Sequence, residues 1–313
     1  MTYPRSHLID PEGGTYHVCS RCVRRTFLCG IDALTGKDFS HRRAWIEKRI
    51  IELSKLFNVS IYAYAVMSNH YHIVLTMTPT MLSDDEVAER WLRLCPVKQR
   101  GDHTEQAYNF RKSLIMANED RLAELRGRLQ SLSWFMRFLN EPLARMANRE
   151  DNCTGRFWEG RFKSQILLDE ASVLACMVYV DLNPIRAGIA ESVETSDHTS
   201  IRRRVKHSNE TDSLGAIDDD TSSTPYSPLS LRDYLALIDW TSDAQSNQRR
   251  SMPSRVAASF RSHHTNTDHW FRDHLPQSHH WQRAMGSVES LREYAKSIGQ
   301  CWIKSRSMDR IAG

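Results

Sequence analysis

The sequence predicts an α+β fold, in which an antiparallel sheet of ferredoxin-like arrangement is backed by helices. Strand-like runs of β-branched and aromatic residues alternate with amphipathic helical segments over the first 207 residues. Their order is strand, helix, strand, strand, helix, strand, helix, which is typical of a split β-α-β arrangement.

The first half of this order lies within residues 15–77. Residues 15–23 alternate and predict a strand, and residues 41–57 predict an amphipathic helix with Ser40 as its N-cap. Two strand-like runs follow, on either side of the turn pair Ser68-Asn69. They predict an antiparallel hairpin whose second strand begins with the residues "HYH".

The second half begins with a charged insertion. Residues 80–130 contain two helical segments and predict a helical insertion outside the core sheet. An amphipathic helix over 131–149 and a strand at about 162–168 come next. They are followed by a helix that is apolar on nearly every side, with Asp169 as its N-cap, which predicts burial on more than one face.

These elements predict a first domain over residues 1–207 that includes the 80–130 insertion. Residues 208–230 are acidic and rich in Ser, Thr and Pro, which is typical of a linker. Residues 231–313 predict a helical C-terminal region.

Composition narrows the class of protein. No apolar run approaches the roughly 18 residues of a membrane span, and the N-terminus lacks an apolar signal core, so we expect a cytoplasmic protein without membrane contact. The seven scattered cysteines do not form a disulfide framework. The net charge is only +4, but basic residues cluster near positions 21–25, 156–163 and 202–206. Such clusters suit a groove for a polyanion, although solvated charge on unrelated faces explains them equally well.

The motif "HYH" places His70 and His72 on one face of a strand, about 6–7 Å apart at Cα. Two imidazoles at this spacing can chelate one divalent ion, whereas Tyr71 points to the opposite face and anchors the strand in the core. A bare pair of polar residues near a hairpin end is the alternative interpretation.

Tyr179 and Asn183 lie one turn apart on the apolar helix and therefore share a face. An amide oxygen from Asn183 could complete a site of two histidines and one oxygen, which suits Mg²⁺ or Mn²⁺ acting on a phosphate. Tyr179 would then lie where its phenol could attack phosphorus. Two alternatives remain open: Tyr179 as a core aromatic, and Asn183 as the cap of the turn that begins at Pro184.

Two segments resemble a known family. "VMSNHYHIVL" is similar to the HUH motif of single-strand nucleases, and "GRFWEGRFKSQILLDEASVLACMVYVDLNPIRAGIA" resembles the catalytic region of the REP-associated tyrosine transposases, within the HUH single-strand DNA transposase superfamily. The resemblance covers about residues 12–200. It implies a catalytic domain with Tyr179 as nucleophile and with His70, His72 and Asn183 as ligands of Mg²⁺ or Mn²⁺.

The resemblance also implies a reaction and a partner. The expected activity is cleavage and transfer of single-stranded DNA at palindromic hairpin repeats, through a 5′-phosphotyrosine intermediate, by a monomer or homodimer. Base stacking on Trp158 is expected, unless this side chain packs in the core, and the basic candidates for backbone contacts are Arg21, Arg24, Arg156, Arg161 and Lys163. The rival functions are a non-catalytic DNA-binding regulator and an HUH nuclease of the replication or mobilisation kind.

Overall fold

The computed structural model describes residues 13–23, 28–32, 35–96, 104–207, 213–215, 217, 227–245, 254, 257, 281–301, 303 and 305–307 of the 313-residue chain. Its centre is a six-stranded sheet in the order β2-β3-β1-β4-β7-β8. The antiparallel part consists of β1 (Gly14–Arg21), β2 (Val59–Val66), β3 (His70–Met77) and β4 (Lys163–Leu167). This part confirms the predicted fold class and the predicted hairpin.

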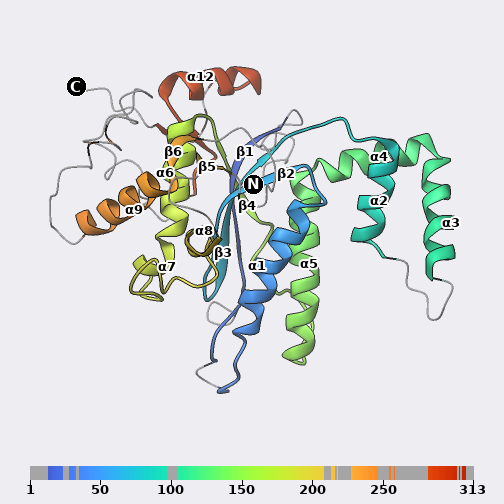
Figure 1. The fold of residues 1–313 in the computed structure, drawn as a ribbon, viewed down its shortest axis with the longest axis horizontal. Helices are drawn as coiled ribbons and strands as arrows, with labels where there is room; N and C mark the ends of the chain where they lie inside the picture. Colours follow the sequence, from blue (N-terminus) through green and yellow to red (C-terminus); the bar gives the residue numbers. More distant parts are fainter. Residues whose placement is uncertain are drawn as a thin grey trace.

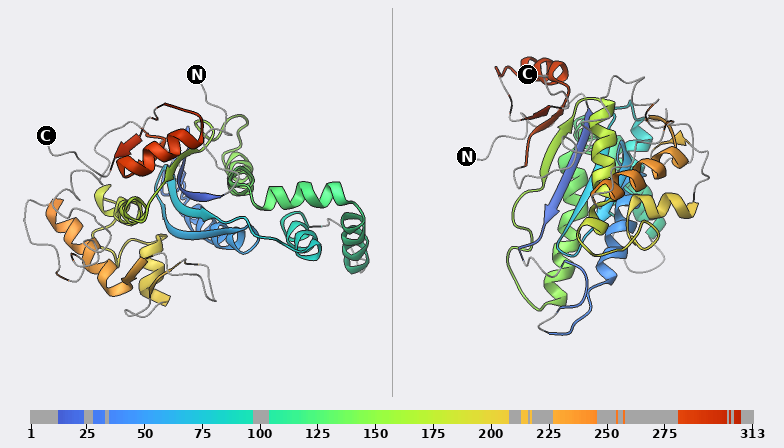
Figure 2. Two further views of the ribbon diagram at one scale, coloured as in Figure 1. Left: turned by 90° about the horizontal axis from the view of Figure 1, so that it is seen from above. Right: turned by 90° about the vertical axis from the view of Figure 1, so that its left-hand side faces the viewer.

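Helices cover both faces of the sheet (Figures 1 and 2). The α1 (His41–Ser54) and α5 (Leu132–Glu150) helices pack against one face, where Tyr16, Tyr71 and Ile73 enter the larger apolar core. The α6 helix (Glu170–Asp181) packs against the other face, which carries Val74 and Leu167 in a second core. Side chains alternate along each strand, so the residues next to Tyr16, Tyr71 and Ile73 point to the opposite face and towards α6.

The α6 helix begins at a capping box. The Asp169 side chain accepts a hydrogen bond from the Ser172 amide, and the Ser172 hydroxyl accepts one from the Asp169 amide. The short helix α7 (Asn183–Arg186) follows α6 directly and begins with Asn183-Pro184. The cap, the burial of α6 and this second turn fix the positions of Tyr179 and Asn183 over the sheet.

The helical insertion is confirmed, and it contains one helix more than the sequence indicated. Helices α2 (Asp84–Leu94), α3 (Thr104–Met116) and α4 (Glu119–Leu129) project to one side of the sheet (Figure 1). The polar segment between the two expected helices forms α3, in which Lys112 is paired with Asp85 and Glu89 of α2. These ion pairs connect α3 to α2, although the apolar periodicity of α3 is weak.

The C-terminal region differs from the expected linker and helices. Helices α8 (Ser200–His207), α9 (Leu231–Gln245) and α12 (Val288–Ser297) are present, but the segment expected to be a linker contains two paired strands, β5 (Ser213–Leu214) and β6 (Ser227–Ser230). In addition, β7 (Ala284–Gly286) pairs parallel to β4, and β8 (Ser305–Ser307) extends the sheet beyond β7. The C-terminal region is thus helical as expected and adds two short strands, which are formed by non-local pairing and not by a local pattern.

Two local predictions also change. Ser40 precedes α1, but its side chain makes no cap hydrogen bond. In the basic run 202–206, Arg204 is buried and donates to the Tyr62 and Gly215 carbonyl oxygens, so this member of the run is structural. Among the described residues, the helices are too short or too polar to cross a bilayer.

Candidate active site at the end of the sheet

The two histidines of the HYH motif lie on the face of β3 that α6 covers. The rings of His70 and His72 are nearly perpendicular, with centroids 4.8 Å apart. Tyr71 points to the opposite face, where its hydroxyl donates to Asn140 Oδ1 at 2.5 Å. The strand alternation that the sequence required is thus present, and it leaves both imidazoles facing the same helix.

Tyr179 reaches the histidines from α6. Its ring lies edge-on to His72, with centroids 5.6 Å apart. Asn183 lies one turn later, and its side chain acts to lower the pKa of Tyr179. Leu182 is the N-cap of α7 and Asn183 is its first residue, so Asn183 does not serve as the cap that the sequence left open. Within the described residues, no hydrogen bond or ring contact joins Asn183 directly to either histidine.

A third histidine, which sequence analysis missed, completes the cluster. His17 lies on β1, and its Nε2 is 2.9 Å from His72 Nδ1. Its ring also lies 5.9 Å from the Tyr179 ring and 4.8 Å from the Trp281 ring. A lone histidine in an alternating strand carries no signal of its own; only the pairing of β1 with β3 brings it beside the motif.

Hydrogen bonds determine which nitrogen each histidine presents. His17 Nε2 and His72 Nδ1 share one hydrogen bond, and in the tautomer with His72 Nδ1 as its donor, His17 Nε2 accepts. His70 Nδ1 lies 2.5 Å from Asn69 Oδ1, an oxygen that only accepts. With both Nδ1 atoms of the motif as donors in these bonds, both Nε2 atoms carry a lone pair.

Burial keeps these imidazoles neutral. It lowers the pKa of His17 and that of His70 to about 4, and the nearby Arg21 guanidinium adds to the effect at His70. The pKa of His72 falls well below its usual value, mainly through burial and also through the two neighbouring histidines. A neutral imidazole is the form that binds metal ions.

The Tyr179 phenol is held in its protonated form. Burial raises its pKa above the ordinary value, whereas the nearby Asn183 side chain and the positive charge of Arg186 act in the opposite direction. The Arg186 guanidinium carbon lies 5.6 Å from the centroid of the Tyr179 ring. Arg186, which sequence analysis did not single out, is therefore positioned to stabilise negative charge on this residue.

Two unsatisfied polar atoms fit a divalent ion. His72 Nε2 and the Asn183 side-chain amide nitrogen are buried and have no hydrogen-bond partner. Because the two ends of an amide are assigned from their partners, the opposite rotamer would present the Asn183 oxygen there. Among the described residues, no group of three or more His, Cys, Asp or Glu is arranged to hold a metal. A metal would thus depend on His70, His72 and the Asn183 amide, all neutral ligands.

The predicted DNA-binding residues are dispersed. Arg21 and Lys163 are exposed at the sheet end that carries His70, since Arg21 pairs in register with His70 and Lys163 with Cys19. Arg156 and Arg161 are exposed on the segment that leads into β4. Arg24 lies outside the described residues.

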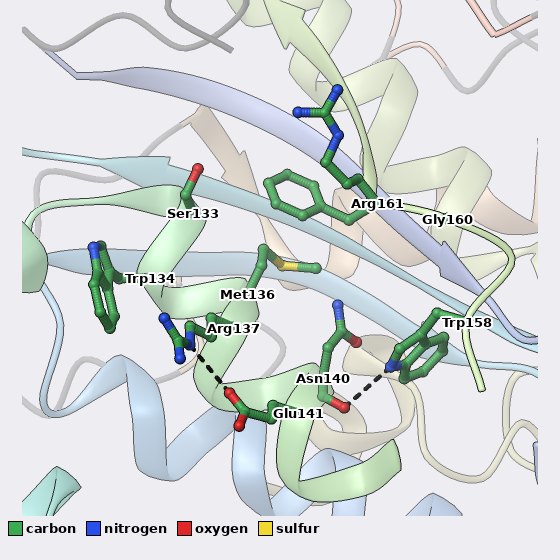
Figure 3. A pocket seen from close by; sticks show the side chains of 10 residues that line it. Ser133, Trp134, Met136, Arg137, Asn140, Glu141, Trp158, Gly160 and Arg161 are labelled. Atoms are coloured by element: carbon green, nitrogen blue, oxygen red, sulfur yellow. Dashed lines mark hydrogen bonds and ion pairs between the residues drawn. The ribbon is translucent and has the colours of Figure 1, made fainter. Parts of the chain in front are cut away.

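Trp158 packs partly in the core. Its indole nitrogen donates to the Asn140 carbonyl oxygen at 3.0 Å (Figure 3). Its ring also contacts Tyr71 edge-on. Its neighbour Phe157 is buried. One edge of the Trp158 ring therefore packs in the core. Stacking of a base on the rest of the ring stays a prediction.

Neither protein-family models nor curated proteins gave a significant match to the sequence. Among solved structures, a REP-associated tyrosine transposase bound to a REP hairpin is similar, at 16% sequence identity and a TM-score of 0.40. The similarity covers 72% of this chain and 96% of that chain.

Proposed function

We propose that the chain is a metal-dependent single-stranded DNA endonuclease and strand transferase with Tyr179 as its nucleophile. One observation carries the proposal: the Tyr179 ring lies against His72, whose buried Nε2 has no partner. The motifs around His70 and Tyr179 that resemble the tyrosine transposases support the same reaction.

Each residue has a defined part in the proposed reaction. His70, His72 and Asn183 would hold Mg²⁺ or Mn²⁺, which supplies polarisation of the scissile phosphate when bound. The Tyr179 oxygen attacks phosphorus, the bond to the 3′ oxygen breaks, and the leaving 3′-hydroxyl takes up a proton. The product is a 5′-phosphotyrosine. One phosphodiester replaces another, so attack by a second 3′-hydroxyl rejoins the strand without ATP.

Proton removal from Tyr179 needs assistance. Because burial raises the pKa of Tyr179, the phenolate is scarce at neutral pH unless positive charge stabilises it. Arg186 lies beside the ring, and a divalent ion held by His70, His72 and Asn183 would supply further positive charge. Arg21 and Lys163 lie at the open end of the sheet, where they would contact the phosphates of the bound strand.

An adduct assay tests this proposal. A single-stranded palindromic repeat from the encoding genome, labelled at its 3′ end, is incubated with the protein and Mn²⁺. The label should stay with the protein on a denaturing gel, because the 5′-phosphate of the labelled fragment is linked to tyrosine. Tyr179→Phe should abolish the adduct and retain the fold by circular dichroism. Tyr108→Phe, on α3, is the matched control and should leave the adduct unchanged.

The same assay separates the rival functions. The double variant His70→Ala/His72→Ala should bind the oligonucleotide but form no adduct. A wild-type protein that binds the repeat and never becomes labelled would favour a DNA-binding regulator. An adduct that persists in Tyr179→Phe would refute the assignment of the nucleophile.

A further inference from the structure

A groove rich in arginine and tryptophan runs along α5, on the face of the sheet opposite Tyr179. Its larger part, about 960 Å³, lies between α5 and residues of α2, α4 and the segment 153–155. A second hollow of about 510 Å³ adjoins it and shares Trp134, Arg137 and Glu141 (Figure 3). We call the two together the α5 groove. Neither part contains a histidine of the cluster, Tyr179 or Asn183, although Trp158 and Arg161 line the second hollow.

The α5 groove is lined by far more positive than negative charge. Five arginines line it, and Glu141 is its sole acidic residue among the described lining residues; the arginines are Arg128, Arg137, Arg145, Arg149 and Arg161. This excess contrasts with the net charge of only +4 on the whole chain. A concave surface of one charge sign attracts a ligand of the opposite sign.

Helical spacing places three of these arginines in a row. Arg137, Glu141, Arg145 and Arg149 are each four residues apart on α5, so they follow one stripe of the helix. At 1.5 Å per residue, the stripe is about 18 Å long. Glu141 forms ion pairs with both Arg137 and Arg145, whereas Arg149 has no ion pair among the described residues. The Arg137 and Arg145 side chains are 59% and 73% exposed, and both are therefore accessible.

Aromatic rings hold the guanidinium groups. The Arg128 and Arg137 guanidinium carbons lie 4.2 Å and 4.9 Å from the centroid of the Trp134 ring. Trp91 and Phe138 support Trp134 at centroid distances of 6.0 Å and 6.2 Å. A guanidinium stacked on an aromatic ring presents its N–H groups at the edge, where Arg128 pairs with Glu124 and Arg137 with Glu141, and its plane can stack on a base. Interleaved cations and aromatic rings are typical of surfaces that bind single-stranded nucleic acid.

The α5 groove leads towards the candidate active site. Arg161 and Phe162 line its second hollow, and the next residue, Lys163, begins β4 on the face that carries His17. The Lys163 ammonium lies 6.0 Å from the centroid of the Trp281 ring, which in turn contacts His17. A chain of basic and aromatic side chains thus passes around the end of the sheet from one face to the other.

We propose that the α5 groove is a second nucleic-acid site, which binds a single-stranded segment away from the scissile phosphate. The arginine stripe contacts the phosphates, and Trp134 with its stacked guanidinium groups contacts unpaired bases. The helical insertion supplies Trp91 and Arg128, so the proposal also gives a role to residues 80–130. Binding requires no strand cleavage, and the proposal therefore stands independently of the reaction at Tyr179.

Fluorescence anisotropy tests the proposal. The probe is a labelled oligothymidylate of about 20 nucleotides, titrated with full-length Tyr179→Phe protein without divalent ions. Adding Arg137→Ala, Arg145→Ala and Arg149→Ala should weaken binding at least about tenfold at about 0.1 M salt. The slope of log affinity against log salt should become shallower by about 2, since each single-strand phosphate contact contributes about 0.7. Lys48→Ala/Lys55→Ala on the surface of α1 is the matched control and should leave both quantities unchanged.

A gain-of-function variant guards against misfolding as an explanation. Glu141→Gln removes the acidic residue and releases Arg137 and Arg145 from their ion pairs, so it should tighten binding severalfold. Equal affinity of the wild type and the triple variant would overturn the proposal. Tighter binding of a duplex than of oligothymidylate through the same arginines would overturn the single-strand assignment. Displacement of oligothymidylate by polyglutamate at equal charge concentration would identify an acidic polypeptide as the ligand instead.

Discussion

The bond between His17 and His72 determines what the histidine motif can do. His17 Nε2 accepts from His72 Nδ1 in the tautomer that leaves His72 Nε2 unprotonated. The unpartnered His72 Nε2 then carries the lone pair that a metal ion requires. Loss of a residue that orients a metal-binding histidine in this way commonly lowers metal affinity by about 10- to 100-fold.

Replacing His17 should therefore weaken metal binding. His17→Phe leaves His72 Nδ1 without its acceptor, and we expect Mn²⁺ affinity to fall about 10- to 100-fold by isothermal titration calorimetry. His17→Gln retains an acceptor oxygen and should recover part of the loss. Unchanged Mn²⁺ affinity in His17→Phe would mean that His17 does not orient His72.

The sequence predicted part of this site and missed the rest for a physical reason. His70 and His72 share a face through strand periodicity, and Tyr179 and Asn183 through helix periodicity, so local spacing was sufficient for each pair. His17, Gln165 and Trp281 join the site through strand pairing and chain-distant packing. Such contacts have no local periodic signature, and a lone polar residue in a strand is equally typical of a surface position.

At the scale of the elements, α1 is fixed to its surroundings by buried polar contacts. Near its start, the fully buried Arg42 pairs with Glu150 and Asp151 at the C-terminal end of α5. Further along, Glu47 accepts hydrogen bonds from Tyr64 at 2.6 Å and from His198 at 2.7 Å. The amphipathic pattern predicted the helix, but these partners are 17 to 151 residues away and could not be read from it.

The Glu47 contacts predict acid sensitivity. Burial opposes ionisation of Glu47, but the hydrogen bonds from His198 and Tyr64 outweigh it and hold its pKa below the ordinary value. A lowered folded-state pKa contributes stability above the unfolded pKa of about 4.3, and this stability is lost as the pH falls through the folded pKa. The free energy of unfolding should thus fall between about pH 5 and pH 3, and more steeply in the wild type than in Glu47→Gln.

Urea unfolding at several pH values measures this difference. Glu52→Gln, on the exposed side of α1, is the control and should retain the wild-type pH dependence. If Glu47→Gln and the wild type lost stability in parallel, the contacts of Glu47 would not contribute to folding stability in the ionised form.

At the scale of the whole molecule, the C-terminal region belongs to the sheet and to the candidate site. The β7 strand pairs with β4, and Trp281, just before β7, donates from its indole nitrogen to the Ser164 carbonyl oxygen at 3.1 Å. Composition alone indicated a separate helical region after a linker. The strands β7 and β8 are only three residues long, so the pairing that joins them to β4 leaves no alternating pattern in the sequence.

This arrangement predicts that the C-terminal region influences chemistry at Tyr179. Trp281→Ala removes the ring that lies against His17, and we expect slower adduct formation without loss of the folded state. Trp281→Phe keeps an aromatic ring there and should retain most of the rate. The measurement is the time course of the 3′-labelled adduct, with thermal unfolding as the control. Identical rates for the wild type, Trp281→Ala and Trp281→Phe would mean that Trp281 does not influence the reaction at Tyr179.

The identity of the nucleophile is the central claim, and mass spectrometry tests it most directly. Trypsin cleaves after Lys163 and Arg186, and residues 164–186 contain Tyr179 as their single tyrosine. After incubation with the hairpin oligonucleotide and Mn²⁺, nuclease trimming and digestion, this peptide should carry a 5′-phosphonucleotide on Tyr179. A nucleotide on any other residue, or a labelled protein whose 164–186 peptide is unmodified, would contradict the account.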